Sequence, residues 1–356
     1  MISLGARAAA VRETVAELCE APPSAAELIE AVAEGVRRIV PYDTGNWMIT
    51  DPETLLPTSI FSVDVPSALQ RPFTELELDD RDDVNRFDAL VRAHQSAASL
   101  SWATGGDLAA SRRFREVHRP FGLGDELRAV ARSANVTWGM GCINRADDVR
   151  DFSAEEVRFV ASIAELLGAG LRRALLPGPA SPEPLRALGV LIIGEQLDIE
   201  ASTGEAERWL ETLQPTFVGD LPAPIAMVAI QAQVNGRNTS IQRPARLRVP
   251  VPGGWLLIHA DSLKTADAAA GRVAVVLEPA DRAELMPLLI ALHGLTERER
   301  DVAELLVAGL GIDEIAARLH ISRHTVRDYI KAIFAKVGVS SRPGLTAALA
   351  PEPSVA

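Results

Sequence analysis

The amino-acid sequence predicts an α+β multidomain protein that ends in an all-α domain. The run 177–184 contains four prolines and one glycine, which can continue neither a helix nor a central strand, so it predicts a linker. The segments 1–176 and 185–281 mix helical and strand patterns, whereas 294–356 shows helical patterns throughout. At about 150 residues a domain, 356 residues suggest two or three domains, and the patterns divide the chain into three with a connecting helix at 282–293.

The first segment predicts two helices followed by a sheet. Helical patterns cover 1–19 and 24–39, and short strands are expected at 46–50 and 58–63. A paired set of strands follows at 127–133 and 136–143, with a turn near Asn135. Trp47 and Trp138 lie on these strands, and we consider them both as residues of a ligand pocket and as ordinary core residues.

A long helix closes the first segment, with Ser153 and Glu156 forming a capping box at its start. Apolar residues follow in steps of three and four: Val157, Val160, Ala164, Leu167 and Leu171. The order of helix, mixed sheet and long terminal helix, with NRADDVRDFSAEEVRFVASIAELLGAGLRRAL at its end, resembles a GAF domain, which implies a GAF-like α/β sandwich. The five apolar residues fit a coiled-coil seam between two protomers and equally a helix that packs on its own sheet.

The second segment predicts a strand at 189–194, an extended piece, helices at 205–213 and 225–234, and three final strands. Those strands are expected at 245–251, 254–260 and 272–278. This order, with the opening GVLIIGEQLDIEAST, resembles a PAS domain and implies a PAS-like α+β fold. His259 lies on one of the strands, where a satisfied or exposed histidine is favoured over a haem ligand.

The last segment predicts three capped helices separated by tight turns. Thr296 and Glu299 form a capping box at the first helix, and Gly309 can end it in the left-handed conformation. A short helix begins near Ile312, and Ser322 is a good N-cap for the helix that follows.

The helix after Ser322 has one apolar and one mostly basic face. The apolar face repeats at helical spacing through Val326, Ile330, Ile333 and Val337. The opposite face carries Arg323, His324, Arg327, Asp328 and Lys331. Such a helix fits the major groove of DNA, and a second helix that crosses the DNA backbone completes helix-turn-helix geometry. A plain helical bundle with a solvated basic face and a sigma-factor region are the alternatives.

The run LTERERDVAELLVAGLGIDEIAARLHISRHTVRDYIKAIFAKVGVSSR resembles the DNA-binding domain of LuxR/NarL/FixJ transcriptional regulators. The resemblance implies that Arg327, Asp328 and Lys331 reach base edges and nearby phosphates, and that Lys336 touches the DNA backbone. It places a phosphate at the helix N-terminus, where backbone amides and the helix dipole favour an anion. The residues at that end are Ser322, Arg323, His324 and Thr325.

The resemblance also implies a homodimer, because the last helix of the domain pairs two copies in family members. Here that helix would begin near Ser341, with Arg342 in its first turn and Leu345 behind it. Gly344 makes it less stable than usual, so the dimer contacts are expected to come mainly from the upstream domains. Gly311 stands where many relatives carry a serine or asparagine cap, which weakens that cap by a few tenths of a kcal/mol.

Charge and composition limit the remaining functions. The net charge of −12 argues against nucleic-acid binding by the whole surface, but the Debye length of about 8 Å leaves a local basic face effective. No run of about 18 apolar residues occurs, so we expect no membrane contact. Cys19 and Cys142 show no metal-binding or redox spacing, and together with the lack of an export signal they indicate a cytoplasmic protein with reduced thiols.

Enzymatic motifs are missing from the sequence: it has no phosphate loop, no GxSxG elbow, no HExxH and no dinucleotide fingerprint. The acidic run Asp79, Asp80, Asp82 and Asp83 is interpreted as a solvated loop rather than a metal site. We therefore expect no enzyme activity, no cofactor and no metal.

The sequence as a whole predicts a transcription regulator that binds double-stranded DNA as a homodimer, with a small-molecule effector or a signalling protein as further partner. Two alternatives stay open for the upstream domains. They could form a ligand-free scaffold that docks other proteins. They could also bind an acyl-homoserine lactone, although that subgroup lines its pocket with several Trp and Tyr residues and this chain has two tyrosines.

Overall fold

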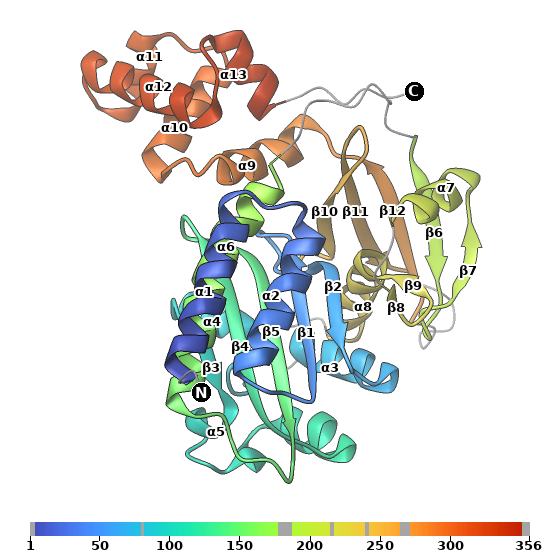
Figure 1. Ribbon diagram of the computed structural model, residues 1–356. Coiled ribbons are helices and arrows are strands. Elements are labelled where there is room, and N and C mark those ends of the chain that lie inside the picture. Colours follow the sequence, from blue (N-terminus) through green and yellow to red (C-terminus); the bar gives the residue numbers. More distant parts are fainter. Residues whose placement is uncertain are drawn as a thin grey trace.

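The computed structural model describes residues 4–79, 82–176, 187–213, 217–238, 242–263 and 271–350. The predicted linker at 177–184 and Asp80 lie outside the described residues. The described part contains two five-stranded antiparallel sheets and a helical C-terminal region (Figure 1). The term "first unit" is used below for α1 to α6 with their sheet, and "second unit" for β6 to β12.

The first unit is built on a sheet with the order β2-β1-β5-β4-β3. Its strands are β1 (Thr44–Thr50), β2 (Pro57–Val63), β3 (Ala97–Ser99), β4 (Leu123–Ser133) and β5 (Val136–Ala146). All pairs are antiparallel, and β1 pairs with both β2 and β5. Alternate residues therefore point to opposite faces, so that each face needs its own cover.

Three long helices cover one face of this sheet (Figure 1). They are α1 (Leu4–Glu20), α2 (Ala25–Ile39) and α6 (Ala154–Ala174). The capping box predicted at the start of α6 is present, with Ser153 accepting from the Glu156 amide. The other face carries α3 (Ser67–Asp79) and α4 (Phe87–Arg92), followed by α5 (Leu100–Ala103) and three short helices between Leu108 and Phe121.

The second unit repeats the same strand order along its own chain. Its sheet runs β10-β11-β12-β6-β7, so in both units the first strand lies between the second and the fifth. The strands are β6 (Gly189–Ile193), β7 (Ile199–Ser202), β10 (Arg246–Val251), β11 (Gly254–Ser262) and β12 (Val273–Pro279). The helices are α7 (Gly204–Thr212) and α8 (Ala223–Arg237), with the short pair β8 (Phe217–Val218) and β9 (Leu221–Pro222) between them.

Helix α8 lies between the two units. It packs on β11 and β12 of its own sheet and on β2 and α3 of the first unit. Every residue from Ala223 to Val234 is buried, which is the pattern expected of a helix covered on all sides. A buried ion pair adds to this contact: the Arg248 guanidinium donates to both carboxylate oxygens of Asp51 at 2.8 and 2.9 Å.

The C-terminal region is all helical. The connecting helix α9 (Arg282–Leu292) leads into α10 (Glu297–Val307), α11 (Ile312–Leu319), α12 (Arg323–Val337) and α13 (Arg342–Leu349). Figure 1 shows this group beyond α6, at one end of the molecule. None of the described helices combines the length and the apolar composition that a membrane crossing needs.

Most predicted elements are confirmed within a few residues, including α7, α8 and the last three strands. No helix or strand was predicted between Ser67 and Phe121, but the chain forms α3 to α5 and β3 there. One interpretation there is wrong. Asp83 does not lie in a solvated loop, because its carboxylate is buried and accepts from Arg113 Nη1 at 3.1 Å.

Candidate nucleic-acid interface

The start of the helical region is held by the capping box predicted for α10. Thr296 Oγ1 accepts from the Glu299 amide, and the Glu299 carboxylate accepts from the Thr296 amide at 2.7 Å. Lys336 of α12 donates to the same carboxylate at 2.6 Å. Burial favours the neutral form of Glu299, but the bonds from Lys336 and Thr296 outweigh it and hold the pKa of this carboxyl below its usual range.

The turn between α11 and α12 fixes the angle at which α12 is presented. His320 adopts the left-handed conformation with φ of 54°, and the Ile321 amide donates back to the Ala316 carbonyl. Ser322 then caps α12 by accepting from the Thr325 amide at 3.0 Å. Helix α12 ends at Gly338, which has φ of 76°. Because these contacts are local, the sequence contains most of what is needed to build them.

One face of α12 packs into the core of the region and the other is exposed. The buried side chains are Val326, Ile333 and Val337, as predicted, whereas the predicted Ile330 is partly exposed. They pack with Val302 and Leu306 of α10 in one apolar cluster. The exposed residues from the N-cap to Lys331 are Ser322, Arg323, His324, Arg327, Asp328 and Lys331.

The charges on this exposed face differ in their partners. Arg323 is paired with Asp313 of α11, and His324 Nε2 lies 3.6 Å from the Asp328 carboxylate. Among the described residues, no carboxylate pairs with Arg327 or Lys331. Two cations on adjacent turns of one helix are therefore free to bind an external anion.

A family model described as "Bacterial regulatory proteins, luxR family" matches residues 293–349. This range begins just before α10 and ends with α13. Residues 293–349 form a LuxR-type helix-turn-helix domain. The order of the capped helices within that range is the one predicted from the sequence.

Two curated relatives match part of the chain. The chain is 38% identical over 109 residues to "Response regulator RamR" of Streptomyces coelicolor, which covers 28% of this chain and 52% of the relative. It is 50% identical over 48 residues to "Spore germination protein GerE" of Bacillus subtilis, which covers 14% of this chain and 65% of the relative. The chain thus spans less than two thirds of either relative.

Solved structures with a likeness to this chain are more distant. The complex "SdiA in complex with octanoyl-rac-glycerol" is 12% identical with a TM-score of 0.34, over 94% of this chain and 91% of that one. A GAF domain/HD domain protein from Geobacter sulfurreducens is 16% identical with a TM-score of 0.32, over 41% and 91%. The VqsR LBD domain from Pseudomonas aeruginosa is 16% identical with a TM-score of 0.30, over 44% and 93%. TM-scores at this level do not establish a common fold.

Three residues of the LuxR-type domain that were predicted to contact DNA or a second protomer instead make contacts inside this chain. The Lys336 ammonium is engaged by Glu299 and by the Gly294 carbonyl. Arg342 donates from Nε to the Leu306 carbonyl at 2.9 Å, which satisfies the end of α10. Leu345 is 0% exposed in the core. Ser341 stays exposed and caps α13 by accepting from the Gly344 amide.

The residues of α6 that were predicted as a dimer seam also pack within this chain. Four of them are buried against the sheet and against α1 and α2: Val160, Ala164, Leu167 and Leu171. Val157 is partly exposed. A second copy could reach the four buried side chains only if this core opened.

The tryptophans considered for a ligand pocket lie in the core beneath α2 and α6. Trp47 and Trp138 are 1% and 0% exposed and belong to the cluster on that face of the sheet. Met48 follows Trp47 on β1 and points to the opposite face, as does Met140, its partner on β5; the structure has a pocket on that face. Neither Trp47 nor Trp138 lines this pocket.

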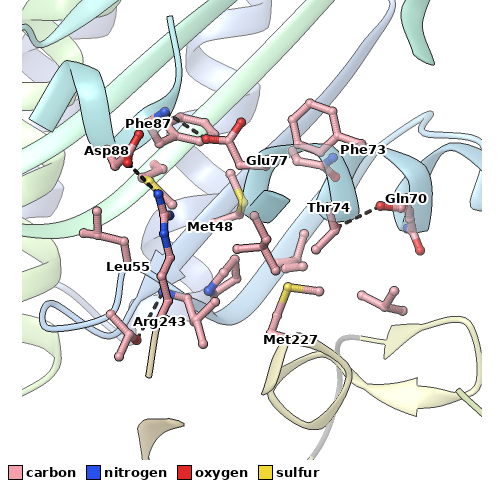
Figure 2. Close-up of a pocket in the computed structure, with 18 residues that line it drawn as sticks. Met48, Leu55, Gln70, Phe73, Thr74, Glu77, Phe87, Asp88, Met227 and Arg243 are labelled. Atoms are coloured by element: carbon pink, nitrogen blue, oxygen red, sulfur yellow. Dashed lines mark hydrogen bonds and ion pairs between the residues drawn. The ribbon is translucent and has the colours of Figure 1, made fainter. Parts of the chain in front are cut away.

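The pocket lies between the two units (Figure 2). Met48, Phe73 and Phe87 line it from the first unit, and Met227 and Arg243 line it from the second. The space not filled by atoms is about 790 Å³, part of it open to solvent. Local sequence patterns do not predict this pocket, because its walls come from segments more than 100 residues apart.

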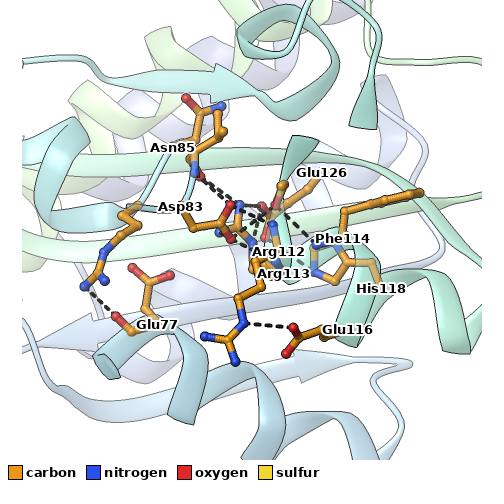
Figure 3. Close-up of polar contacts among 12 residues, drawn as sticks. Glu77, Asp83, Asn85, Arg112, Arg113, Phe114, Glu116, His118 and Glu126 are labelled. Atoms are coloured by element: carbon orange, nitrogen blue, oxygen red, sulfur yellow. Dashed lines mark hydrogen bonds and ion pairs between the residues drawn. The ribbon is translucent and has the colours of Figure 1, made fainter. Parts of the chain in front are cut away.

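A buried charge cluster lies on the same face of the first sheet (Figure 3). Arg113 donates to Glu126 at 2.7 Å and to Asp83, while Arg128 donates to Glu126 at 3.0 Å and to Glu77 at 2.7 Å. His118 lies beside Glu126, with Nε2 at 3.8 Å from the carboxylate.

Burial sets the protonation state of His118, because the removal of water disfavours the imidazolium. It lowers the pKa of His118 to about 4, against the opposing attraction of Glu126. Cys142, on the same face, is buried too, which raises the pKa of its thiol to about 12 and leaves it unreactive near neutral pH.

Proposed function

We propose that this protein is a transcription regulator that binds specific double-stranded DNA through α12. The observation that carries the proposal is the exposed face of α12, where Arg327 and Lys331 have no partner among the described residues. Cations of this kind bind phosphate oxygens and guanine edges, and phosphate binding releases counterions. The match of residues 293–349 to the LuxR family model supports the same function.

The remaining contacts follow from the position of each side chain on α12. Ser322, Arg323, His324 and Thr325 surround the N-terminus of α12, where free amides favour a phosphate. Asp328 is exposed beside Arg327 and is proposed to accept from a cytosine amino group or to orient a neighbouring cation. Lys336 is assigned to the fold, because its ammonium is held by Glu299.

We further propose that the protein binds DNA as a homodimer, because one small domain buries only about 600–1,000 Å² on DNA. The division into a GAF-like domain at 1–176, a PAS-like domain at 185–281 and a DNA-binding domain at 294–356 is part of this proposal. Two antiparallel sheets with the same strand order support it. In this proposal the two sheet units control DNA binding.

The test is selection of DNA sites from a random pool by the full-length protein at about 0.15 M salt, the ionic strength at which screening is physiological. The double variant Arg327→Ala/Lys331→Ala is compared with Arg12→Ala/Arg282→Ala, which removes two exposed cations outside α12. We expect the wild type and the control to enrich a two-fold-related site, and the α12 variant to enrich none. Enrichment of one site by all three proteins would reject the role of α12.

A further inference from the structure

We propose that the pocket between the two units binds a neutral, mostly apolar small molecule that contacts both units at once. This inference rests on the proposed function, since it names the class of effector that the regulator would sense. The pocket is a partly enclosed space lined by side chains of both units, and its empty volume of about 790 Å³ includes open solvent. Small-molecule sites are typically concave and mostly apolar, with a few polar groups that orient the ligand.

The walls of the pocket are apolar and adaptable. Met48, Met140 and Met227 approach it from two strands of the first unit and from α8 of the second, and Phe73 and Phe87 complete these walls. All five side chains are buried. Methionine side chains fill irregular shapes at low cost, which suits a ligand of varied outline better than a rigid aromatic box does.

The charged groups at the pocket are already paired with one another, which decides the charge of the ligand. The Asp88 carboxylate accepts from Arg243 at 2.8 Å (Figure 2) and from Arg86 at 3.2 Å. The Glu77 carboxylate accepts from Arg128 at 2.7 Å and from the Phe87 amide at 3.0 Å. A charged ligand would find no free counter-charge among these groups and would lose its hydration, so a neutral one is favoured.

Neutral polar groups remain for orientation. Among the described residues the side-chain amide of Gln70 forms no hydrogen bond, and Asn46 uses only its oxygen, which accepts from Ser62 at 2.7 Å. An amide can both donate and accept. The ligand is therefore expected to carry a hydroxyl, carbonyl or amide on an otherwise apolar body.

The pocket also explains how such a ligand would act on the whole protein. Met227 and Arg243 belong to the second unit, so the bound molecule replaces solvent at the contact between the units. A ligand that binds only the joined arrangement stabilises it by mass action. The ligand thus strengthens the contact that Arg248 and Asp51 already make.

The experiment uses two fluorescent probes with the same rings, neutral N-phenylnaphthylamine and anionic anilinonaphthalenesulfonate, added to the full-length protein without DNA. We expect saturable binding of one neutral probe per chain and binding of the anionic probe that is at least about tenfold weaker. No saturable binding of the neutral probe, or equal binding of both, would overturn the proposal. Because DNA is absent, a failed DNA experiment leaves this result unaffected.

Two variants locate the probe. Met48→Trp fills the pocket from the first unit and Met227→Trp fills it from the second, and each should weaken binding of the neutral probe by about tenfold or more. The control Ile199→Trp adds the same bulk on the exposed edge strand β7 and should bind as the wild type does. Unchanged binding in either filled variant would show that the probe sits elsewhere and would reject the site. Circular dichroism confirms that each variant is folded.

Discussion

Cationic side chains have opposite environments in the first unit and on α12. Arg113 and Arg128 are 1% and 0% exposed, and each donates to two carboxylates. Arg327 and Lys331 are exposed, and no described carboxylate pairs with them. The difference separates two roles: the buried arginines hold segments of the first unit together, whereas Arg327 and Lys331 have no described carboxylate partner and remain available to an external anion, which in the proposed function is DNA phosphate.

The largest effect is expected where a buried cation is removed. Arg128→Met leaves the buried Glu126 short of a partner and should lower the free energy of unfolding by about 3–5 kcal/mol. Denaturant unfolding followed by the fluorescence of the buried Trp47 and Trp138 measures the change. The control Arg150→Met removes an exposed partner of Glu156 and should cost about 1 kcal/mol or less. Equal losses of unfolding free energy in Arg128→Met and Arg150→Met would contradict the structural role given to the buried arginines.

The buried cluster also predicts a dependence of stability on pH. The folded pKa of His118 is about 4 and its ordinary value is 6.5, so between these values the unfolded chain binds a proton that the folded chain does not. Stability should therefore fall as pH falls from 6.5 towards 4, by up to about 1.4 kcal/mol per pH unit from this group. His293, whose pKa is also lowered by burial, adds to the fall in the same direction.

Unfolding measured between pH 7 and pH 4 separates these contributions. His118→Met should make the pH dependence shallower over that window, whatever its effect on stability at pH 7. A wild-type slope in His118→Met would mean that His118 is not neutral in the folded protein near pH 6.

A smaller effect, on DNA affinity, is expected from single changes on α12. Arg327→Ala should cost about 1–3 kcal/mol of specific binding if it contacts a base, and about one unit of salt slope for a lost phosphate contact. The free energy of unfolding of Arg327→Ala should differ from that of the wild type by about 0.5 kcal/mol or less, because no described residue forms an ion pair with Arg327. Fluorescence anisotropy on the selected site at several salt concentrations measures the first effect, and thermal unfolding measures the second. Full affinity with a normal salt slope would remove Arg327 from the interface.

The smallest effect concerns the cap of α11. Gly311→Ser supplies the missing side-chain acceptor and should stabilise the helical domain by a few tenths of a kcal/mol. The same substitution at Gly309, where φ is 101°, should destabilise it by about 1 kcal/mol because a side chain is strained in that conformation. Thermal unfolding of the two variants should give shifts of opposite sign. Shifts of the unfolding temperature with the same sign would show that Gly311 and Gly309 do not act as the helix cap and the left-handed turn residue described here.

The two regions also differ in how far sequence alone predicts them. The C-terminal helices are fixed by contacts within a few residues, such as Thr296 with Glu299 and Ser322 with Thr325, so a local pattern predicts their ends. The left-handed His320 was missed because it is not a glycine. The helical spacing of apolar residues predicts which face of α12 is exposed. The sequence does not show which charged side chains on that face are paired with carboxylates.

The first unit depends on distant contacts instead. Glu77 meets Arg128 across 51 positions, and Asp51 meets Arg248 across 197. The fold decides which of many acids pairs with which arginine, so the burial of Asp83 could not be predicted from its acidic neighbours in the sequence. The pocket was missed for the same reason, since Met48 and Met227 line one space only when the two units pack.

The most direct test of the central claim compares two lysines of α12. Lys331 is unpaired among the described residues, whereas Lys336 is held by Glu299 at 2.6 Å. Binding to the selected site is measured for Lys331→Ala and Lys336→Ala over a range of salt, together with thermal unfolding. We predict that Lys331→Ala loses about one unit of salt slope with unchanged stability, and that Lys336→Ala keeps the slope but unfolds at a lower temperature. A loss of slope in Lys336→Ala alone would contradict the claim that the partners of a cation decide its role.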